Sequence, residues 1–431
     1  MGCGMGKLAC LRFGKLMLIR VAPAIGLALA LISPVRAQLI QANVAEIAAA
    51  IIVSQSVPVQ TKTTARDQAL VLEQQGRNAE AEAAWRRVLT AHPSSAEAFA
   101  HLGLLEARQE HYKEAIPLYR KALALAPAMP ALRLNLGLAL FKDGDLKQAI
   151  QQFQLVKAPP AGSPQEQQLT LLMGMAHYGL GEFAEAAEDL KKAAAVDPQN
   201  LQLRLALAHS CLWSKQYQCV LDTFHEILML NAESAEADML AGEALDEMKD
   251  HGAAIQQFRA AVKADPNVPD VHFGLGYLLW SQKQYTEAVT EFQAELANNP
   301  NHAQALVHLG DAEMQLQHPE LALPQLLKAA AIDSKLEFAH LDLGVLYSDG
   351  GRNADALREL LVAEKLDPGD VSVHYHLGRL YKSMGKREAA KAEFDKAAKI
   401  TRTVDEDLMK KMGNGSYPTQ PAVDWPKEAG K

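Results

Sequence analysis

Histidine is the residue type in this chain whose recurrence first raises the question of chemistry, because imidazole can bind metals and transfer protons. His272, His340 and His374 take one place in a repeating pattern, and His101, His308 and His376 take another. His374 and His376 are two positions apart, so on a helix they point to different sides and cannot bind one ion together. Histidines such as His340 and His374 could share a metal between successive elements, but no cysteine or carboxylate recurs with them. Recurrence in register therefore favours packing, and we predict no metal site.

Carboxylates are the second group that could do chemistry. Glu243, Asp246 and Glu247 fall within one charge-rich stretch, which is typical of a solvated helix face. General acid–base catalysis needs a buried carboxylate with a facing partner, and the sequence indicates neither. H-E-x-x-H, G-x-S-x-G and Walker-type motifs are absent from the sequence. We therefore predict no catalytic residue, no cofactor and no small-molecule substrate, and hence a protein that is not an enzyme.

Cys211 and Cys219 are the two cysteines outside the first ten residues. An exported protein meets oxidising conditions, under which two nearby thiols form a disulfide. A bridge requires Cα atoms within about 7 Å of each other. The sequence leaves two alternatives open, a disulfide across a turn or two separate small apolar residues.

The elements that carry these residues repeat with a period of 34 residues. Glycines mark the period at 103, 137, 242, 276, 310, 344 and 378, and Gly174 joins the series after a three-residue insertion near 159–164. Twelve residues after each glycine comes a small residue, as at Ala115 and Ala288, and four further on a large apolar one, as at Tyr119 and Phe292. A proline usually closes the unit, since proline cannot continue a helix.

This pattern resembles the tetratricopeptide repeat, a helix–turn–helix unit of 34 residues. The resemblance covers residues 62–403 as about ten repeats, and it implies an all-α, right-handed superhelical solenoid. The glycine then lies where the two helices cross, facing the alanine of the second helix. The fifth repeat departs from the pattern, with Ala208 at the glycine place, Val220 at the small place and Ala232 at the proline place.

The same resemblance implies that the first helix of each pair lines a concave groove that binds a partner. Phe273, Tyr277 and Trp280 are spaced four and three apart, so we expect them on one helix face, and we expect alanine at Tyr277 and Trp280 to weaken binding without unfolding the chain. Acidic residues nearby would favour a partner with apolar and basic side chains. The predicted groove residues are Leu171, Met175, Tyr178, His209, Leu212, Met239, Glu243, Phe273, Tyr277, Trp280, Asp311 and Met314.

The N-terminus has the pattern of an export signal. Five basic residues and no acid occur in the first 37 residues, an uncharged apolar run covers 21–32, and Val35-Arg36-Ala37 offers a cleavage site. We predict a signal peptide over 1–37 and a periplasmic or secreted protein. The alternative is a membrane anchor formed by 21–32, although about 20 apolar residues are needed to span a bilayer.

The remaining segments complete the predicted organisation. Residues 38–61 are a linker or a short lead helix, 404–412 a capping helix with apolar residues every four positions, and 413–431 a Gly/Pro-rich flexible tail. The chain has a formal net charge of −8, and it becomes more acidic without the basic N-terminus, so nucleic acid is an improbable partner. The sequence therefore predicts a protein–protein interaction scaffold. The alternative is a non-catalytic regulatory or assembly subunit of an envelope enzyme complex.

Overall fold

The computed structural model describes residues 64–129, 131–230 and 233–413, which are helical with turns between the helices and contain no strand. Within these residues the chain forms two compact units, which we call the N-terminal unit (64–265) and the C-terminal unit (266–413). The predicted signal peptide, the lead segment over 38–61 and the tail from 414 lie outside the described residues. The predicted all-α fold of consecutive helix–turn–helix repeats is confirmed.

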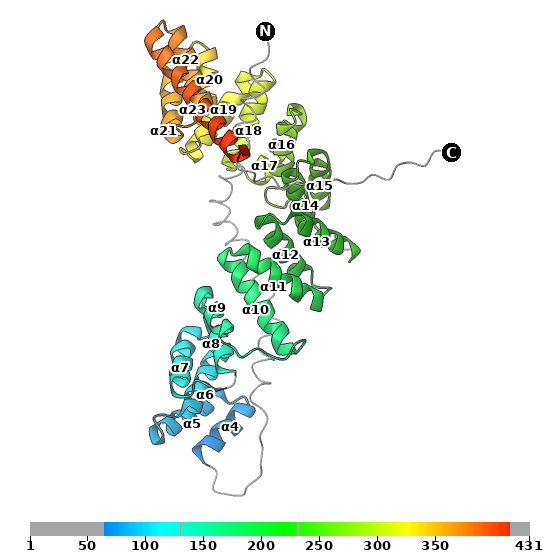
Figure 1. The fold of residues 1–431 in the computed structure, drawn as a ribbon, viewed down its shortest axis with the longest axis vertical. Helices are drawn as coiled ribbons and strands as arrows, with labels where there is room; N and C mark the ends of the chain where they lie inside the picture. Colours follow the sequence, from blue (N-terminus) through cyan, green and yellow to red (C-terminus); the bar gives the residue numbers. More distant parts are fainter. Residues whose placement is uncertain (1–63, 130, 231–232, 414–431) are drawn as a thin grey trace, which may run out of the picture. The chain divides into compact units, whose positions relative to one another are not determined.

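The N-terminal unit contains six helix pairs, and its helices α4 to α9 lie together in the lower part of Figure 1. In chain order its helices are α4 (Ala65–Gln74), α5 (Asn78–Ala91), α6 (Ala96–Arg108), α7 (Tyr112–Leu125), α8 (Leu132–Asp143), α9 (Leu146–Gln154), α10 (Pro164–Leu180), α11 (Phe183–Val196), α12 (Leu201–Trp213), α13 (Tyr217–Met229), α14 (Ala235–Glu247) and α15 (His251–Ala264).

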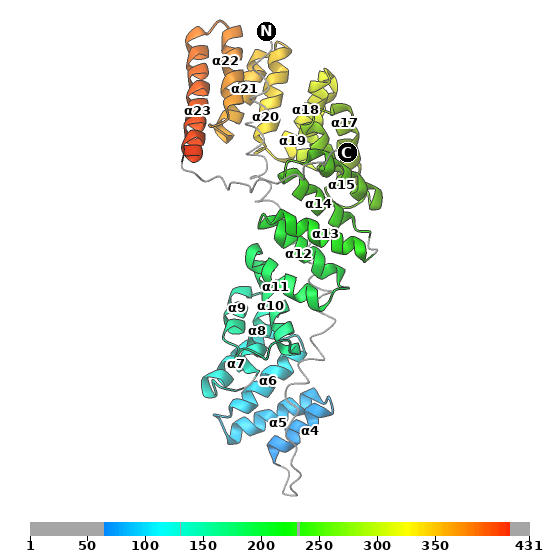
Figure 2. The ribbon, with the colours of Figure 1, turned by 45° about the vertical axis from the view of Figure 1, so that its right-hand side comes forward.

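The C-terminal unit contains four further pairs, whose last helices pack side by side in Figure 2. Its helices are α16 (Val271–Ser281), α17 (Tyr285–Asn298), α18 (Ala303–Gln315), α19 (Pro319–Ile332), α20 (Glu337–Asp349), α21 (Asn353–Leu366), α22 (Val371–Ser383) and α23 (Arg387–Gly413).

Eight of the ten described pairs have a close crossing of their two helices at the repeated glycine, whereas α4–α5 and α12–α13 have Ala69 and Ala208 at that place. A Cβ atom at Gly137 would lie 2.5 Å from the Phe153 ring, and one at Gly344 would lie 2.5 Å from Leu360. These distances are far inside van der Waals contact, so only glycine lets the ring of the second helix lie flat against the first. The facing alanines, such as Ala115 and Ala288, are fully buried. The predicted packing of glycine, alanine and the large residue is therefore what the structure contains.

Turns inside the pairs share one backbone feature, a residue in the left-handed conformation. Glycine takes this place at 76, 144, 181, 351 and 385, whereas Glu110, Lys215, Lys249, Lys283 and Gln317 adopt positive φ angles there. Glycine adopts this conformation without steric cost. The turn therefore has the same geometry in all ten described pairs, including those in which the sequence offers no glycine to indicate it.

First helices begin at side chains that accept backbone N–H groups. Ser95, Ser163, Asn200 and Ser234 each accept from the third residue beyond, which satisfies a donor that has no partner within the helix. These caps place the start of their helices directly after the turn that joins two pairs, whereas α8, α16 and α20 begin without a side-chain cap.

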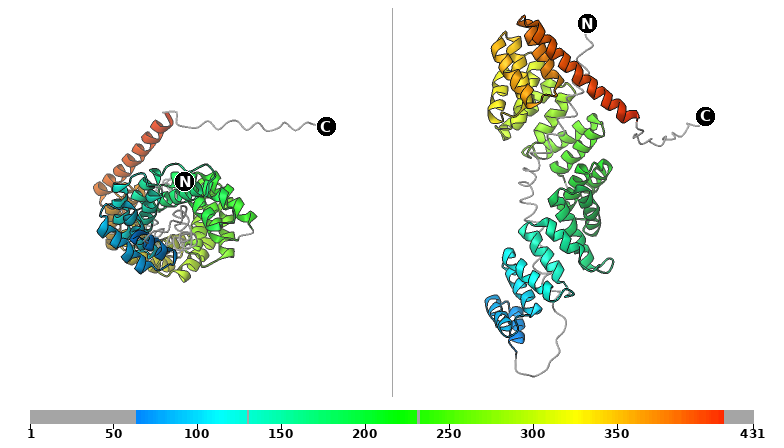
Figure 3. Two further views of the ribbon diagram at one scale, coloured as in Figure 1. Left: turned by 90° about the horizontal axis from the view of Figure 1, so that it is seen from below. Right: turned by 60° about the vertical axis from the view of Figure 1, so that its left-hand side comes forward.

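The last helix differs from the sequence prediction. Residues 404–412 do not form a separate capping helix, because α23 continues without a break from Arg387 to Gly413 (Figure 3). No proline or glycine interrupts 387–412, and the good helix formers in this stretch favour continuation over a turn. None of the helices described here is both long enough and apolar enough to cross a membrane.

The crossing predicts opposite effects of one substitution at two glycines of the α14–α15 pair. A Cβ at Gly242 would lie 2.6 Å from the Phe258 ring, whereas at Gly252 its nearest neighbour would be Asp250 Oδ1 at 3.8 Å. We expect Gly242→Ala to lower the free energy of unfolding by about 1–3 kcal/mol, the usual cost of overpacking. Gly252→Ala should raise it by up to about 1 kcal/mol, because alanine favours the helix. Urea unfolding followed by circular dichroism measures both, and equal effects would contradict the close crossing.

Candidate functional site

First helices of successive pairs contact one another within each unit. α6 packs on α8 and α12 on α14 in the N-terminal unit, and α16, α18, α20 and α22 pack in series in the C-terminal unit. Second helices of successive pairs contact each other less. In the C-terminal unit, and at these two contacts of the N-terminal unit, the first helices form the tighter row, and the first helices carry the predicted partner-binding residues.

The predicted groove residues fall into two groups by exposure. Eight keep a partly exposed side chain, namely Leu171, Met175, Tyr178, His209, Met239, Glu243, Trp280 and Met314. Four are buried, namely Leu212, Phe273, Tyr277 and Asp311. The first seven residues of the prediction lie in the N-terminal unit and the last five in the C-terminal unit, so the structure presents them as two separate sets.

Ring contacts between neighbouring helices account for the burial of Phe273 and Tyr277. The Phe273 ring lies 6.0 Å from that of Phe292 on α17 and 4.7 Å from that of His302, and the Tyr277 ring lies 5.4 Å from that of His308 on α18. Tyr277 is 6% exposed. Alanine at Tyr277 would therefore remove core packing as well as surface, so the expectation that this change leaves the fold intact is not supported by its burial.

Trp280 and Asp311 form a hydrogen bond between α16 and α18. The indole Nε1 of Trp280 donates to Asp311 Oδ2 at 2.6 Å, and Gln315 Nε2 donates to Asp311 Oδ1 at 3.3 Å. Both carboxylate oxygens thus have donors, which explains how a charged side chain can be buried here. Trp280 itself keeps part of its surface exposed.

An aromatic cluster spans the α10–α11 and α12–α13 pairs in the N-terminal unit. It consists of Tyr178, Phe183, His209 and Trp213, whose ring centroids lie 5.5–6.0 Å apart in five contacts. All four side chains are partly exposed. The sequence prediction included Tyr178 and His209 but missed Phe183 and Trp213. The place of Phe183 at the start of a second helix could have revealed it, because Tyr112, Tyr217 and Tyr285 take that place in other repeats.

His209 is a neutral ring inside this cluster. Trp213 Nε1–H donates to His209 Nε2 at 3.0 Å, so the ring proton of the neutral form lies on Nδ1. His209 Nδ1 is buried and has no hydrogen-bond partner. Burial disfavours the imidazolium and lowers the pKa of His209 to about 4.

Carboxylates gather on α14, which is the first helix of the pair that follows the aromatic cluster in the chain. This helix holds Glu236, Asp238, Glu243, Asp246 and Glu247 and no lysine or arginine. Burial, and next the charge of Glu233, raises the pKa of Asp238 to about 6. Burial, and next the charge of Glu236, raises the pKa of Tyr178 to about 12. The negative charge of α14 therefore acts on the aromatic cluster.

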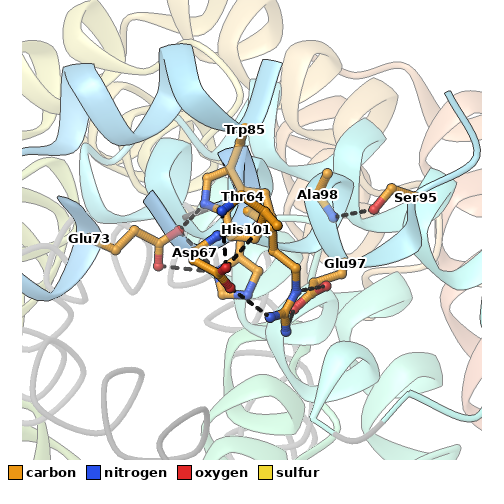
Figure 4. Close-up of polar contacts among 9 residues, drawn as sticks. Thr64, Asp67, Glu73, Trp85, Ser95, Glu97, Ala98 and His101 are labelled. Carbon is orange, nitrogen blue, oxygen red and sulfur yellow. Dashed lines mark hydrogen bonds and ion pairs between the residues drawn. The ribbon is translucent and has the colours of Figure 1, made fainter. Parts of the chain in front are cut away.

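Recurring histidines join the two helices of a pair through glutamate. Nδ1 of His272, His340 and His374 lies 2.7, 2.8 and 2.7 Å from a carboxylate oxygen of Glu291, Glu359 and Glu393. In the first pairs of the N-terminal unit, His101 stacks on Trp85 with ring centroids 4.4 Å apart. Glu73 accepts a hydrogen bond from Trp85 Nε1 at 2.5 Å and lies 3.0 Å from His101 Nδ1 (Figure 4). These histidines hold helices together, which is the packing role that their recurrence predicted.

In the part of the chain that the structure describes, two clusters bring histidine and carboxylate atoms close enough to share a metal ion. The first cluster consists of Glu364, His374 and Glu393. The Lys396 ammonium lies 2.9 Å from an oxygen of each glutamate, so it already supplies a positive charge to this cluster. In Asp270, Glu295 and His302, His302 Nδ1 accepts the Ala305 N–H at 3.1 Å, which leaves the ring proton on Nε2, directed at Asp270. A metal on His302 Nε2 would have to displace that proton. Neither arrangement favours a metal ion.

Cys211 and Cys219 form a disulfide between α12 and α13, with Cα atoms 5.9 Å apart. The bond closes the helix pair whose sequence departs most from the repeat. Of the two alternatives that the sequence left open, the structure contains the bridge. Cys219 also lines a shallow hollow with Lys191, Lys215, Tyr217, Asp222 and Met248, and this hollow is open to solvent.

The neutral state of His209 predicts a specific loss of stability in acid. The pKa of His209 is about 4 in the folded chain and about 6.5 when unfolded. As the pH falls below about 6.5, the unfolded chain binds a proton that the folded chain does not, so this contribution to stability decreases until about pH 4. We expect the parent to lose about 2 kcal/mol more than His209→Gln between pH 7 and pH 5.

Urea unfolding of the parent and variant at both pH values measures this difference. His225→Gln is the matched control, because His225 is an exposed histidine on the adjacent helix α13. The control should keep the pH dependence of the parent. If the free energy of unfolding changed equally with pH in the parent and in His209→Gln, His209 would not be held neutral in the folded chain.

Curated proteins with similar sequences are longer than the segment they share with this chain. Protein CTR9 homolog of Arabidopsis thaliana is 24% identical over 286 residues, which are 64% of this chain and 26% of that protein. DnaJ protein P58IPK homolog B of Oryza sativa subsp. japonica is 24% identical over 235 residues, which are 52% of this chain and 45% of that protein. The chain thus spans less than half the length of these relatives.

Solved structures with similar folds include two repeat proteins. YrrB, described as a TPR protein with an unusual peptide-binding site, is 24% identical with a TM-score of 0.36, and the match covers 44% of this chain and 97% of YrrB. The Cut9–Hcn1 hetero-tetramer structure has a chain that is 14% identical with a TM-score of 0.39, covering 81% of this chain and 90% of that one.

Family models extend over most of the repeat region. Three models, each described as a tetratricopeptide repeat, match this sequence. One matches residues 66–130, 102–164, 221–269, 239–302 and 273–336, another 177–244 and the third 371–403. With its period of 34 residues and its glycine-crossed helix pairs, the chain belongs to the tetratricopeptide-repeat family.

Proposed function

We propose that this protein is a scaffold that binds a partner protein or peptide along its rows of first helices. The observation that carries the proposal is the set of partly exposed apolar side chains on α10, α12 and α14, which includes Leu171, Met175, Tyr178 and Met239. Methionine and aromatic residues are enriched in protein interfaces. Stacked first helices offer a long surface that a single compact domain does not.

The names of further relatives agree with a place in assemblies. BBS4 of Bos taurus, named a BBSome complex member, is 23% identical over 209 residues. TOM70 of Homo sapiens, named a mitochondrial import receptor subunit, is 25% identical over 180 residues. These names support a non-catalytic role for this chain, either as a free-standing scaffold or as a regulatory or assembly subunit of an envelope complex.

Site-specific crosslinking tests the binding surface in cells that produce the protein. We expect a photoreactive phenylalanine analogue at Met175 or Met239, on first helices, to crosslink the same partner protein. Matched controls place it at Glu188 on α11 and Gln256 on α15, which are exposed positions of second helices. Crosslinks of equal yield from both sets, or from the controls alone, would show that the first helices are not the binding surface.

We also propose that the protein is exported, because residues 1–37 combine a basic start, an apolar run and a small-residue cleavage site. We expect mass spectrometry of protein from its native compartment to find Gln38 as the mature N-terminus. A chain that keeps residues 1–37 and is recovered from the cytosol would contradict export, and one that keeps them in the membrane fraction would favour the anchor.

A further inference from the structure

We infer that the face formed by α10, α12 and α14 binds a partner segment in which an apolar side chain is flanked by lysine or arginine. This inference rests on the proposed function and specifies the chemistry of the partner. We call this surface the acidic aromatic face and define it by Met175, Tyr178, His209, Trp213, Met239 and, on α14, the carboxylates of Glu236, Glu243 and Glu247.

Charge on these three helices is almost entirely of one sign. They contain six carboxylates, one on α10 and five on α14, and a single arginine, Arg204, with no lysine. Arg204 is 7% exposed, and its Nη2 lies 3.2 Å from Glu226 on α13. It therefore offers little positive charge to an approaching partner, and the face attracts cations and repels anions.

The carboxylates of α14 differ in their surroundings. The raised pKa of Asp238 means that its ionised form is destabilised by burial and by the neighbouring Glu233. Asp246 has His251 Nδ1 at 2.7 Å, and Glu247 accepts a long hydrogen bond from the Tyr217 hydroxyl at 3.5 Å. Glu236, Glu243 and Glu247 lie along one stripe of α14, at spacings of seven and four residues. A lysine or arginine of a partner would reduce the repulsion among its carboxylates.

The aromatic cluster supplies the apolar part of the face and a second attraction for cations. Its rings expose part of their surface, and the faces of tyrosine and tryptophan attract ammonium and guanidinium groups. His209 lies between Tyr178 and Trp213 in the cluster, with ring centroids 5.5 and 5.9 Å away. Because His209 is neutral, it adds no positive charge that would oppose a bound cation.

His209 also provides a donor that lacks an acceptor. Its Nδ1–H is buried without a hydrogen-bond partner, and an unpaired buried donor destabilises the unbound protein. The negative charge of α14 disfavours a carboxylate at this place, so the acceptor that fits is a neutral carbonyl oxygen of the partner's backbone. Because Nδ1 is buried, such an oxygen reaches it only after a side chain that covers it moves, a change that is common on binding.

The continuity of the face follows from the repeat. Met175, His209 and Glu243 each stand one residue after the glycine place of their repeats, and α12 packs directly on α14. Met175 and Tyr178 of α10 pack against the same buried cluster that contains Leu240 and Ala244 of α14, and burial, with the charge of Glu236 as the second cause, raises the pKa of Tyr178. An extended or helical segment can therefore contact α14 and the aromatic cluster at once.

Peptide binding to the full-length protein tests the inference. The probe is a fluorescent twelve-residue peptide of alternating lysine and leucine, measured by fluorescence anisotropy, with analogues in which glutamine or glutamate replaces every lysine. We expect the lysine peptide to bind at least tenfold more tightly than the glutamine peptide, and the glutamate peptide not to bind. Equal binding of the lysine and glutamate peptides would overturn the inference.

Variants locate the binding. Glu236→Gln with Glu243→Gln should weaken the lysine peptide at least tenfold, whereas Glu185→Gln with Glu188→Gln removes the same charge from exposed positions of α11 and should change affinity less than twofold. Trp213→Leu should weaken it at least fivefold, with folding checked by circular dichroism. Equal losses in both glutamate pairs would mean non-specific attraction and would overturn the inference.

Failure of this inference is distinguishable from failure of the proposed function. If crosslinks to a partner form from Met175 and Met239 while the lysine peptide does not bind, the scaffold role stands and the acidic aromatic face does not select cations. If neither occurs, both proposals fail.

Discussion

The close crossing of two helices at a glycine is the contact on which every other feature of the repeat depends. At this point a Tyr, Phe or Leu of the second helix lies against the bare backbone of the first, as Tyr119 does at Gly103 and Leu326 at Gly310. The large side chains at these places are almost fully buried in the inner repeats. The crossing fixes the distance between the helices of a pair, and the next first helix then packs on both.

The fifth repeat shows what accompanies a change at that contact. Ala208 occupies the glycine place and is buried, and Phe224, at the place of the large side chain, stays partly exposed, unlike Phe153 or Phe292. In this pair the Cys211–Cys219 disulfide joins the helices covalently. A cross-link that closes a short loop stabilises the native state mainly by restricting the unfolded chain. Two described pairs have alanine at the glycine place, α4–α5 with Ala69 and α12–α13 with Ala208, and the second of them has the covalent link.

Polar residues divide between holding the repeats together and facing outward. Glu291, Glu359 and Glu393 are bound to histidines of their own helix pairs, and Lys396 lies between two carboxylates. Burial raises the pKa of Glu393, but its hydrogen bonds to Lys396 and His374 outweigh burial, so its pKa is lowered. On α14, Asp246 lies 2.7 Å from His251 Nδ1 and Glu247 accepts a hydrogen bond from the Tyr217 hydroxyl, while Glu243 keeps a partly exposed side chain.

The sequence by itself determined the fold and the faces of the helices. The repeated glycine, the alanine and the large apolar residue contact one another within one helix pair. The sequence of a single repeat therefore predicts these contacts. The whole sequence also predicted that recurring histidines pack, since a residue that returns in register meets the same neighbours each time.

Only the tertiary structure decided which predicted groove residues are accessible. Spacing places Phe273, Tyr277 and Trp280 on one face, but the side chains that cover the first two come from α17 and α18, beyond the reach of a pattern within one helix. The packing of neighbouring helices also brings Phe183 and Trp213 into contact with Tyr178 and His209. The hydrogen bond from Trp213 to His209 then places the His209 proton on Nδ1. Periodicity fixes the direction of a side chain, whereas burial and protonation depend on atoms that neighbouring helices contribute.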